Sequence, residues 1–120
     1  MATIKAYTDI EQSRKLAEIL PLESVDMNYW CGTQIRIGGH RTMDKDLDIP
    51  CWSLAALLGV LPQSIEFKGD KYYLRFMKDY VEYANDEISI TSRCLHTTGN
   101  DNLVDACVEM IIKLHELNLL

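Results

Sequence analysis

The sequence lacks several features by which protein classes are recognised. It has no run of about 18 apolar residues, the length that a membrane-spanning helix needs, so no membrane partner is expected. Its first residues contain no apolar signal-peptide core, which favours a cytoplasmic location. The four cysteines are scattered, without the close pairs typical of zinc sites. We expect them to be reduced, buried thiols, with no metal and no cofactor.

Positive charge is also scarce. The chain has 12 Lys and Arg against 18 Asp and Glu, which gives a net charge of -6. Sequence-independent binding to phosphate backbones needs clustered basic residues, so no nucleic-acid partner is expected. The hydrophobic fraction of 48% is enough for a packed core, and 120 residues fit a single domain over 1–120.

The stretch 64–98 predicts a three-stranded antiparallel meander. Gly69-Asp70 separates two β-rich runs and predicts a hairpin in which Phe67 pairs with Tyr72. Period-two alternation then groups five apolar residues on the core face: Ile65, Phe67, Tyr72, Leu74 and Phe76. A change of parity near Lys78-Asp79 is interpreted as a β-bulge in one bent strand, with a tight loop as the alternative.

A second turn signal, Asn85-Asp86, predicts that Tyr83 pairs with Ile88. Continued alternation along this last strand puts Cys94 and His96 on the same face. A thiol beside an imidazole is the pattern of a nucleophile and its base, and Cys31 or His40 could complete a metal site. Because no third group that would orient them is evident, we expect no catalytic residue and no metal ligand. A small-molecule- or metal-binding enzyme using Cys94 and His96 stays the alternative.

The remaining elements complete an α+β fold. Alternation predicts a strand over 29–37, and helices are expected over 8–20, 50–58 and 101–117. Thr8 is the expected N-cap of the first helix, Pro50 suits the first position of the second and Gly59 its C-terminal cap. The predicted architecture is an antiparallel sheet of about four strands, the meander plus strand 29–37, with the helices packed on one side.

Two surfaces of this architecture carry more apolar side chains than a small domain easily covers. The helix over 101–117 has only a narrow polar strip. The outer sheet face is rich in the residue types of protein interfaces: Tyr73, Arg75, Met77, Tyr80 and Arg93. We therefore expect a protein partner or self-association as a homodimer.

Two segments also carry a resemblance. The segment 50–58, PCWSLAALL, and the segment 105–114, DACVEMIIKL, resemble those of small proteins encoded in bacterial prophages and other mobile elements. The resemblance implies an accessory, intracellular protein and brings no catalytic residue with it. Together with the surfaces above, it favours a small acidic accessory protein that acts as a protein–protein interaction module.

Overall fold

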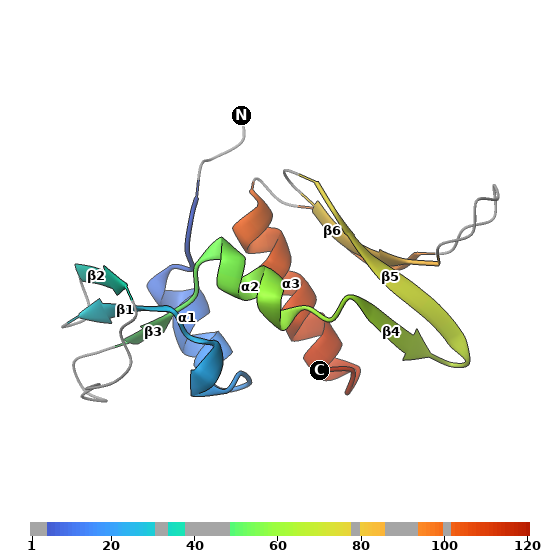
Figure 1. Cartoon of the computed structure of the whole chain (residues 1–120), viewed down its shortest axis with the longest axis horizontal. Helices are drawn as coiled ribbons and strands as arrows, with labels where there is room; N and C mark the ends of the chain where they lie inside the picture. The colour runs from blue at the N-terminus through green and yellow to red at the C-terminus, as the bar shows by residue number, and fades with distance from the viewer. Residues whose placement is uncertain (1–4, 31–33, 38–48, 78–79, 86–93, 100–101) are drawn as a thin grey trace. The chain divides into compact units, whose positions relative to one another are not determined.

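The structure, a computed structural model, describes residues 5–30, 34–37, 49–77, 80–85, 94–99 and 102–120 (Figure 1). The chain divides into two compact units. We call Lys5–Val60 the N-terminal unit, and Leu61–Leu120, which groups with Met1–Ile4, the C-terminal unit. The described residues form α-helices and two antiparallel sheets, which confirms the α+β class. The single domain expected over 1–120 stays a prediction.

The N-terminal unit has a sheet of its own, which the sequence did not predict. Strands β1 (Met27–Trp30), β2 (Gln34–Ile37) and β3 (Ile49–Cys51) lie in the order β2-β1-β3. The predicted single strand over 29–37 is wrong, because Trp30 pairs with Gln34 and the chain reverses between them. Alternating residues continue on both sides of this reversal, so the pattern alone resembles one strand. The intervening sequence contains Gly32, a residue typical of short hairpin loops.

Helix α1 (Ile10–Ala17) begins two residues later than the predicted helix over 8–20. Its N-cap is Asp9, whose Oδ1 accepts a hydrogen bond of 2.8 Å from the Gln12 backbone N–H. The Gln12 side chain in turn accepts from the Asp9 backbone N–H at 3.1 Å, which completes a capping box. The predicted N-cap, Thr8, is fully buried and bonds elsewhere.

Helix α2 (Leu54–Val60) also begins later than the predicted helix over 50–58. Pro50 lies in β3 instead, an edge strand where a missing N–H is tolerated. Ser53 caps the helix, since its Oγ accepts a hydrogen bond of 3.2 Å from the Ala56 backbone N–H. Gly59 lies within the last turn of the helix rather than after it. A short 3-10 helix, η1 (Leu22–Ser24), precedes β1 and packs near α2.

The C-terminal unit contains the meander, with one strand more than predicted. Strands β4 (Ser64–Phe67), β5 (Asp70–Phe76), β6 (Tyr80–Ala84) and β7 (Cys94–Gly99) lie side by side in chain order. The predicted single bent strand is wrong, because Phe76 pairs with Val81 and the chain reverses between β5 and β6. Lys78 and Asp79, where the bulge or the tight loop was expected, lie outside the described residues. The Met77 N–H donates to the Tyr80 carbonyl at 2.9 Å across this reversal. Across this hairpin, even-numbered residues of β5 pair with odd-numbered residues of β6. The core face therefore changes from even to odd numbers at the reversal, and no bulge is needed to explain the change.

The first hairpin turns one residue earlier than predicted. Phe67 pairs with Asp70, and the turn residues Lys68 and Gly69 have φ values of 52° and 85°. Two positive φ values are the signature of a type I′ turn. Ile65 consequently pairs with Tyr72 rather than Leu74. Because this shift is two positions, each residue keeps its predicted face, and Ile65 and Tyr72 are both buried.

The last pairing differs more. Tyr83 lies opposite His96 instead of Ile88, and the turn predicted at Asn85-Asp86 does not pair those strands. Residues 86–93, including Ile88, lie outside the described residues. The residues that pair with β6 to form the last strand therefore lie later in the chain than the sequence predicted.

The final helix, α3 (Leu103–Glu116), confirms the prediction for 101–117 to within two residues at its N-terminal end. The Asn102 side chain caps it by accepting from the Asp105 N–H at 2.8 Å. The helix packs against β6 and β7. Its fully buried side chains are all apolar: Val104, Ala106, Cys107, Met110, Ile111 and Leu114.

Candidate functional site

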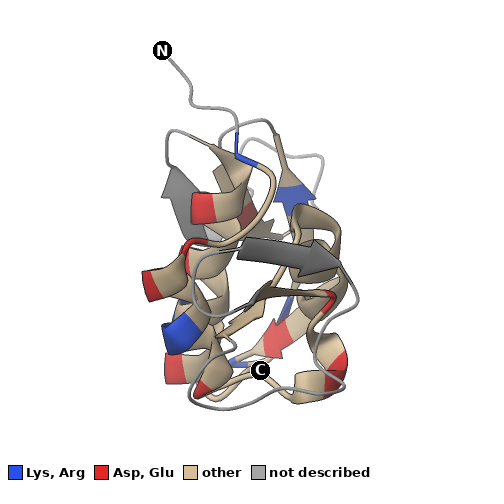
Figure 2. Cartoon of the chain, turned by 90° about the vertical axis from the view of Figure 1, so that its left-hand side faces the viewer, with Lys and Arg blue, Asp and Glu red and all other residues tan. Residues whose placement is uncertain are grey.

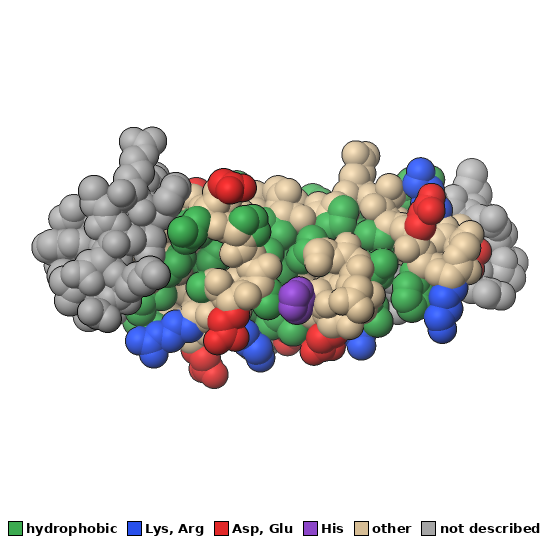
Figure 3. All heavy atoms as spheres, turned by 90° about the horizontal axis from the view of Figure 1, so that it is seen from below, with side chains coloured by type: hydrophobic (Ala, Val, Ile, Leu, Met, Phe, Trp, Pro, Cys, Tyr) green, Lys and Arg blue, Asp and Glu red, His purple; other side chains and the backbone are tan. Residues whose placement is uncertain are grey.

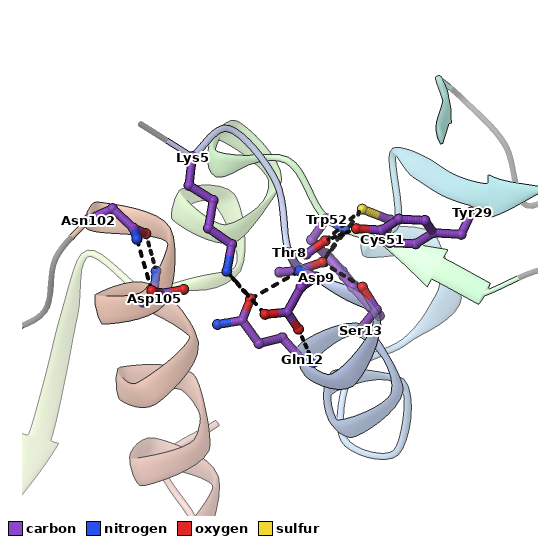
Figure 4. Close-up of polar contacts among 10 residues, drawn as sticks. All are labelled: Lys5, Thr8, Asp9, Gln12, Ser13, Tyr29, Cys51, Trp52, Asn102 and Asp105. Atoms are coloured by element: carbon purple, nitrogen blue, oxygen red, sulfur yellow. Dashed lines mark hydrogen bonds and ion pairs between the residues drawn. The ribbon is translucent and has the colours of Figure 1, made fainter. Parts of the chain in front are cut away.

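A buried polar cluster lies at the centre of the N-terminal unit, where α1, β1 and β3 meet (Figure 4). Thr8 Oγ1 lies 2.7 Å from Ser13 Oγ, and both residues have zero exposure. The same Oγ1 accepts from the Trp52 backbone N–H at 3.2 Å and lies 3.6 Å from Cys51 Sγ. The Thr8 carbonyl accepts from the Tyr29 hydroxyl at 2.7 Å. We call these five residues the Thr8 cluster.

The electrostatics of the Thr8 cluster oppose catalysis. Burial raises the pKa of the Cys51 thiol, although hydrogen bonds from Thr8 and Ser13 partly offset that effect. Burial also raises the pKa of the Tyr29 phenol to about 12, with the neighbouring Cys51 as a smaller cause. A reactive cysteine needs an accessible thiolate, whereas this thiol is neutral and has zero exposure. The cluster therefore joins the segment before α1 to β3 and has no nucleophile to offer.

A second group of polar side chains surrounds the start of α2. The Asp26 carboxylate accepts hydrogen bonds from the Ser53 backbone N–H at 2.9 Å and from the Ser53 hydroxyl. Trp52 Nε1 donates to Ser24 Oγ at 2.9 Å, and Ser24 in turn donates to the Pro21 carbonyl. The Ser53 hydroxyl is thus engaged on both sides, by Asp26 and by the Ala56 N–H of the helix. Its arrangement is that of a helix cap.

Metal-binding chemistry finds no support in the described part of the chain. No three His, Cys, Asp or Glu side chains of the described residues lie close enough together to hold an ion. His115 of α3 is exposed. The face drawn in Figure 3 shows a histidine side chain with hydrophobic side chains beside it. Burial raises the pKa of the Cys107 thiol to about 12, which makes it a poor metal ligand.

The predicted interaction surface falls on β5 and the turn after it. Tyr73 and Met77 are 36% and 59% exposed, and Arg75 is exposed between them. Lys71 Nζ lies 5.6 Å from the centre of the Tyr73 ring, a cation–π contact on the same strand. Tyr80 is only half-buried, and Arg93 lies outside the described residues. Three of the five predicted residues are thus brought together on one strand end.

The sequence prediction missed one exposed residue at this strand end. Phe76 was assigned to the core face, but it is 48% exposed. The residue that it pairs with, Val81, is fully buried. Phe76 is the last residue of β5, and a strand end has fewer neighbours to cover it than a strand centre. Alternation places Tyr73, Arg75 and Met77 on one face and Phe76 on the other. We call Tyr73, Arg75 and Met77 the β5 surface.

The backbone register changes the argument for Cys94 and His96. His96 lies opposite Tyr83, and Cys94 lies opposite Ala84, the next residue of β6. A register irregularity between these pairs takes up one additional residue in β7. The prediction that the Cys94 thiol lies beside the His96 imidazole depended on regular alternation between these two residues. The irregularity interrupts that alternation. The enzyme alternative stays a prediction without this geometric basis.

Comparison with models of protein families, with curated proteins and with solved structures found no match for this chain. The resemblance of segments 50–58 and 105–114 to phage-encoded proteins thus stays a prediction. None of the helices in the described ranges combines the length and the apolar character that crossing a membrane requires.

Proposed function

We propose that this small acidic protein is an interaction module that binds another protein through the β5 surface. The observation that carries the proposal is a concentration of exposed apolar side chains. Of the six large hydrophobic residues exposed within the described residues, two, Tyr73 and Met77, lie on the same face of this strand end, with Arg75 between them. Contiguous exposed apolar groups are typical of binding surfaces, whereas single ones are ordinary.

The composition of the β5 surface supports a protein as the partner. Tyrosine, methionine and arginine are among the types enriched at protein interfaces, and the β5 surface has one of each. The Tyr73 ring is held beside Lys71, so part of its geometry is fixed before binding. An accessory role in a phage or another mobile element belongs to the same proposal and has the sequence resemblance as its support.

The charges beside the β5 surface are of both signs. Arg75 lies opposite Glu82 in the register with β6. Figure 2 shows residues of both signs along the ribbon on the side of the chain that is at the left in Figure 1. Because opposite charges face each other on β5 and β6, we expect shape and apolar contact to be the main determinants of binding.

The test is site-specific photo-crosslinking in the cells that naturally contain the protein. A photoreactive amino acid at Tyr73 should give one discrete covalent adduct with a protein. Adding Met77→Lys to the same chain should abolish the adduct. The matched control is Leu22→Lys, which changes a residue of similar exposure, 56%, in the N-terminal unit and should leave the adduct unchanged. Adducts that survive Met77→Lys, or the absence of any adduct, would contradict the proposal.

A further inference from the structure

The four sheet edges of the described residues differ in how they are protected. An edge strand exposes unpaired backbone N–H and C=O groups, and proteins protect it by keeping it short, by charged side chains or by proline. Three edges have such protection. Strand β2 has four residues and contains Arg36, β3 has three and contains Pro50, and β4 has four and contains Glu66.

Strand β7 is the exception. It is six residues long, Cys94–Gly99, and among the described residues it pairs with β6 alone. Its sequence, CLHTTG, contains no proline and no Lys, Arg, Asp or Glu. The register irregularity is confined to the Cys94 end, so Thr97 to Gly99 form a regular ladder with β6. Within the part of the chain that the structure describes, this end of the edge has none of the usual protection.

The printed hydrogen bonds fix which backbone groups of β7 point outward. Met77 donates to Tyr80, so even-numbered residues of β6 bond to β5 and odd-numbered ones bond to β7. Val81 and Tyr83 therefore bond to Thr98 and His96, their register partners. It follows that the N–H and C=O of Thr97 and Gly99 point to the open side of the sheet.

We propose that β7 pairs antiparallel with β7 of a second copy of this chain, about a twofold axis at Thr97. In this register the N–H and C=O of each Thr97 bond to Thr97 of the other copy. The two four-stranded sheets become one continuous sheet. The proposal goes beyond the proposed function, since it uses the sheet edge and leaves the β5 surface free.

Charge explains why a second copy suits this edge. A strand that pairs with its own copy about a twofold axis places like charges near one another, which is destabilising. Strands β2 and β4 would bring together Arg36 with Arg36, or Glu66 with Glu66, whereas β7 has no charged residue. Threonine at the axis is favourable, because cross-strand Thr–Thr pairs stabilise antiparallel sheets. Twofold pairing is also the commonest symmetry of homo-oligomers.

The first test is sedimentation velocity of the full chain over a series of concentrations. The wild type should sediment as a dimer, and Thr97→Lys should weaken the dimer by about tenfold or more, because it puts two ammonium groups at the axis. The matched control is Gln63→Lys, which makes the same charge change at an exposed residue next to β4, on the other edge of the sheet. This control should leave the dimer unchanged.

The second test does not depend on whether the Thr97→Lys variant folds. Directly opposed residues of a bonded antiparallel pair have Cα atoms about 5.5 Å apart, within the range of a disulfide. Thr97→Cys should therefore give an intermolecular disulfide under mild oxidation, and Gln63→Cys should not. A monomeric wild type, a dimer equally stable in Thr97→Lys, or the failure of Thr97→Cys to crosslink would each overturn the proposal. Loss of the dimer with the Tyr73 adduct intact would separate this proposal from the proposed function.

Discussion

The cores of the two units are made of different chemistry. In the N-terminal unit, Thr8 and Ser13 are as completely buried as the neighbouring Trp52, and their hydroxyls bond to each other. In the C-terminal unit, the fully buried side chains of α3 are all apolar, with sulfur only in Cys107 and Met110. The N-terminal unit thus has a cluster of hydrogen-bonded hydroxyls within its core, whereas α3 is held by apolar packing.

The difference decides how each core tolerates change. Apolar packing is non-directional, so its energy follows the area removed from water. A buried hydrogen bond contributes little net energy but leaves a costly unsatisfied group if one partner is removed. The N-terminal unit already has one such group, since Asn28 is 3% exposed and its Oδ1 has no hydrogen-bond partner among the described residues.

The largest expected effect is in the apolar core. Leu114→Ala removes a fully buried side chain from α3, and it should lower the free energy of unfolding by about 2–5 kcal/mol, because it loses apolar burial and leaves a cavity. The control Glu116→Ala changes an exposed residue of the same helix and should be nearly neutral. Chemical denaturation measures both. Similar small losses for the two variants would mean that α3 is not packed as described.

A smaller but more specific effect is expected in the Thr8 cluster. Thr8→Val keeps the shape of the side chain but leaves the Ser13 hydroxyl and the Trp52 N–H without their partner, at a cost of about 1–3 kcal/mol. Thr8→Ser keeps the hydroxyl and loses one methyl group, so it should cost about 0.8 kcal/mol. If Thr8→Ser proved the more destabilising of the two in denaturation experiments, methyl packing would dominate and the contrast between the cores would disappear.

The contrast also explains what the sequence could predict. The apolar surface of α3, broken only by a narrow polar strip, is a local pattern, and it located the helix because apolar packing only requires residues to share a face. The Thr8 cluster joins residues 43 positions apart, Thr8 and Cys51, whose types and spacing show no pattern. Thr8 was accordingly interpreted as a helix cap, which is the commoner role of threonine before a helix. Of the predicted site, Tyr73, Arg75 and Met77 followed from alternation, whereas the exposure of Phe76 depends on where β5 ends.

The Tyr29 hydroxyl offers a pH-dependent test of the polar core. Tyr29→Phe removes its hydrogen bond to the Thr8 carbonyl and should cost about 0.5–1.5 kcal/mol near neutral pH. Burial raises the pKa of Tyr29 from 10.0 to about 12, so the folded state favours the protonated phenol. Its stabilising contribution is therefore complete below pH 10 and is lost as the pH rises towards about 12. Denaturation of both proteins from neutral to alkaline pH should show their difference shrinking over this interval. A constant difference would place Tyr29 outside the buried cluster.

The smallest effect is expected at the first hairpin turn of the C-terminal unit, which sequence reasoning misplaced by one residue. Sequence reasoning put the turn at Gly69-Asp70, but the structure puts it at Lys68-Gly69, with Lys68 at a positive φ of 52°. Lysine is strained in this left-handed region, and asparagine adopts it more readily. Lys68→Asn should therefore raise the free energy of unfolding by about 0.5 kcal/mol, even though it removes the contact of Lys68 Nζ with the Phe67 ring, 5.3 Å away.

The control Lys71→Asn changes a lysine of β5 beyond the turn and should be slightly destabilising, because asparagine is disfavoured in strands. Thermal unfolding separates the two registers, since a turn at Gly69-Asp70 would place both lysines in strands and make both substitutions destabilising.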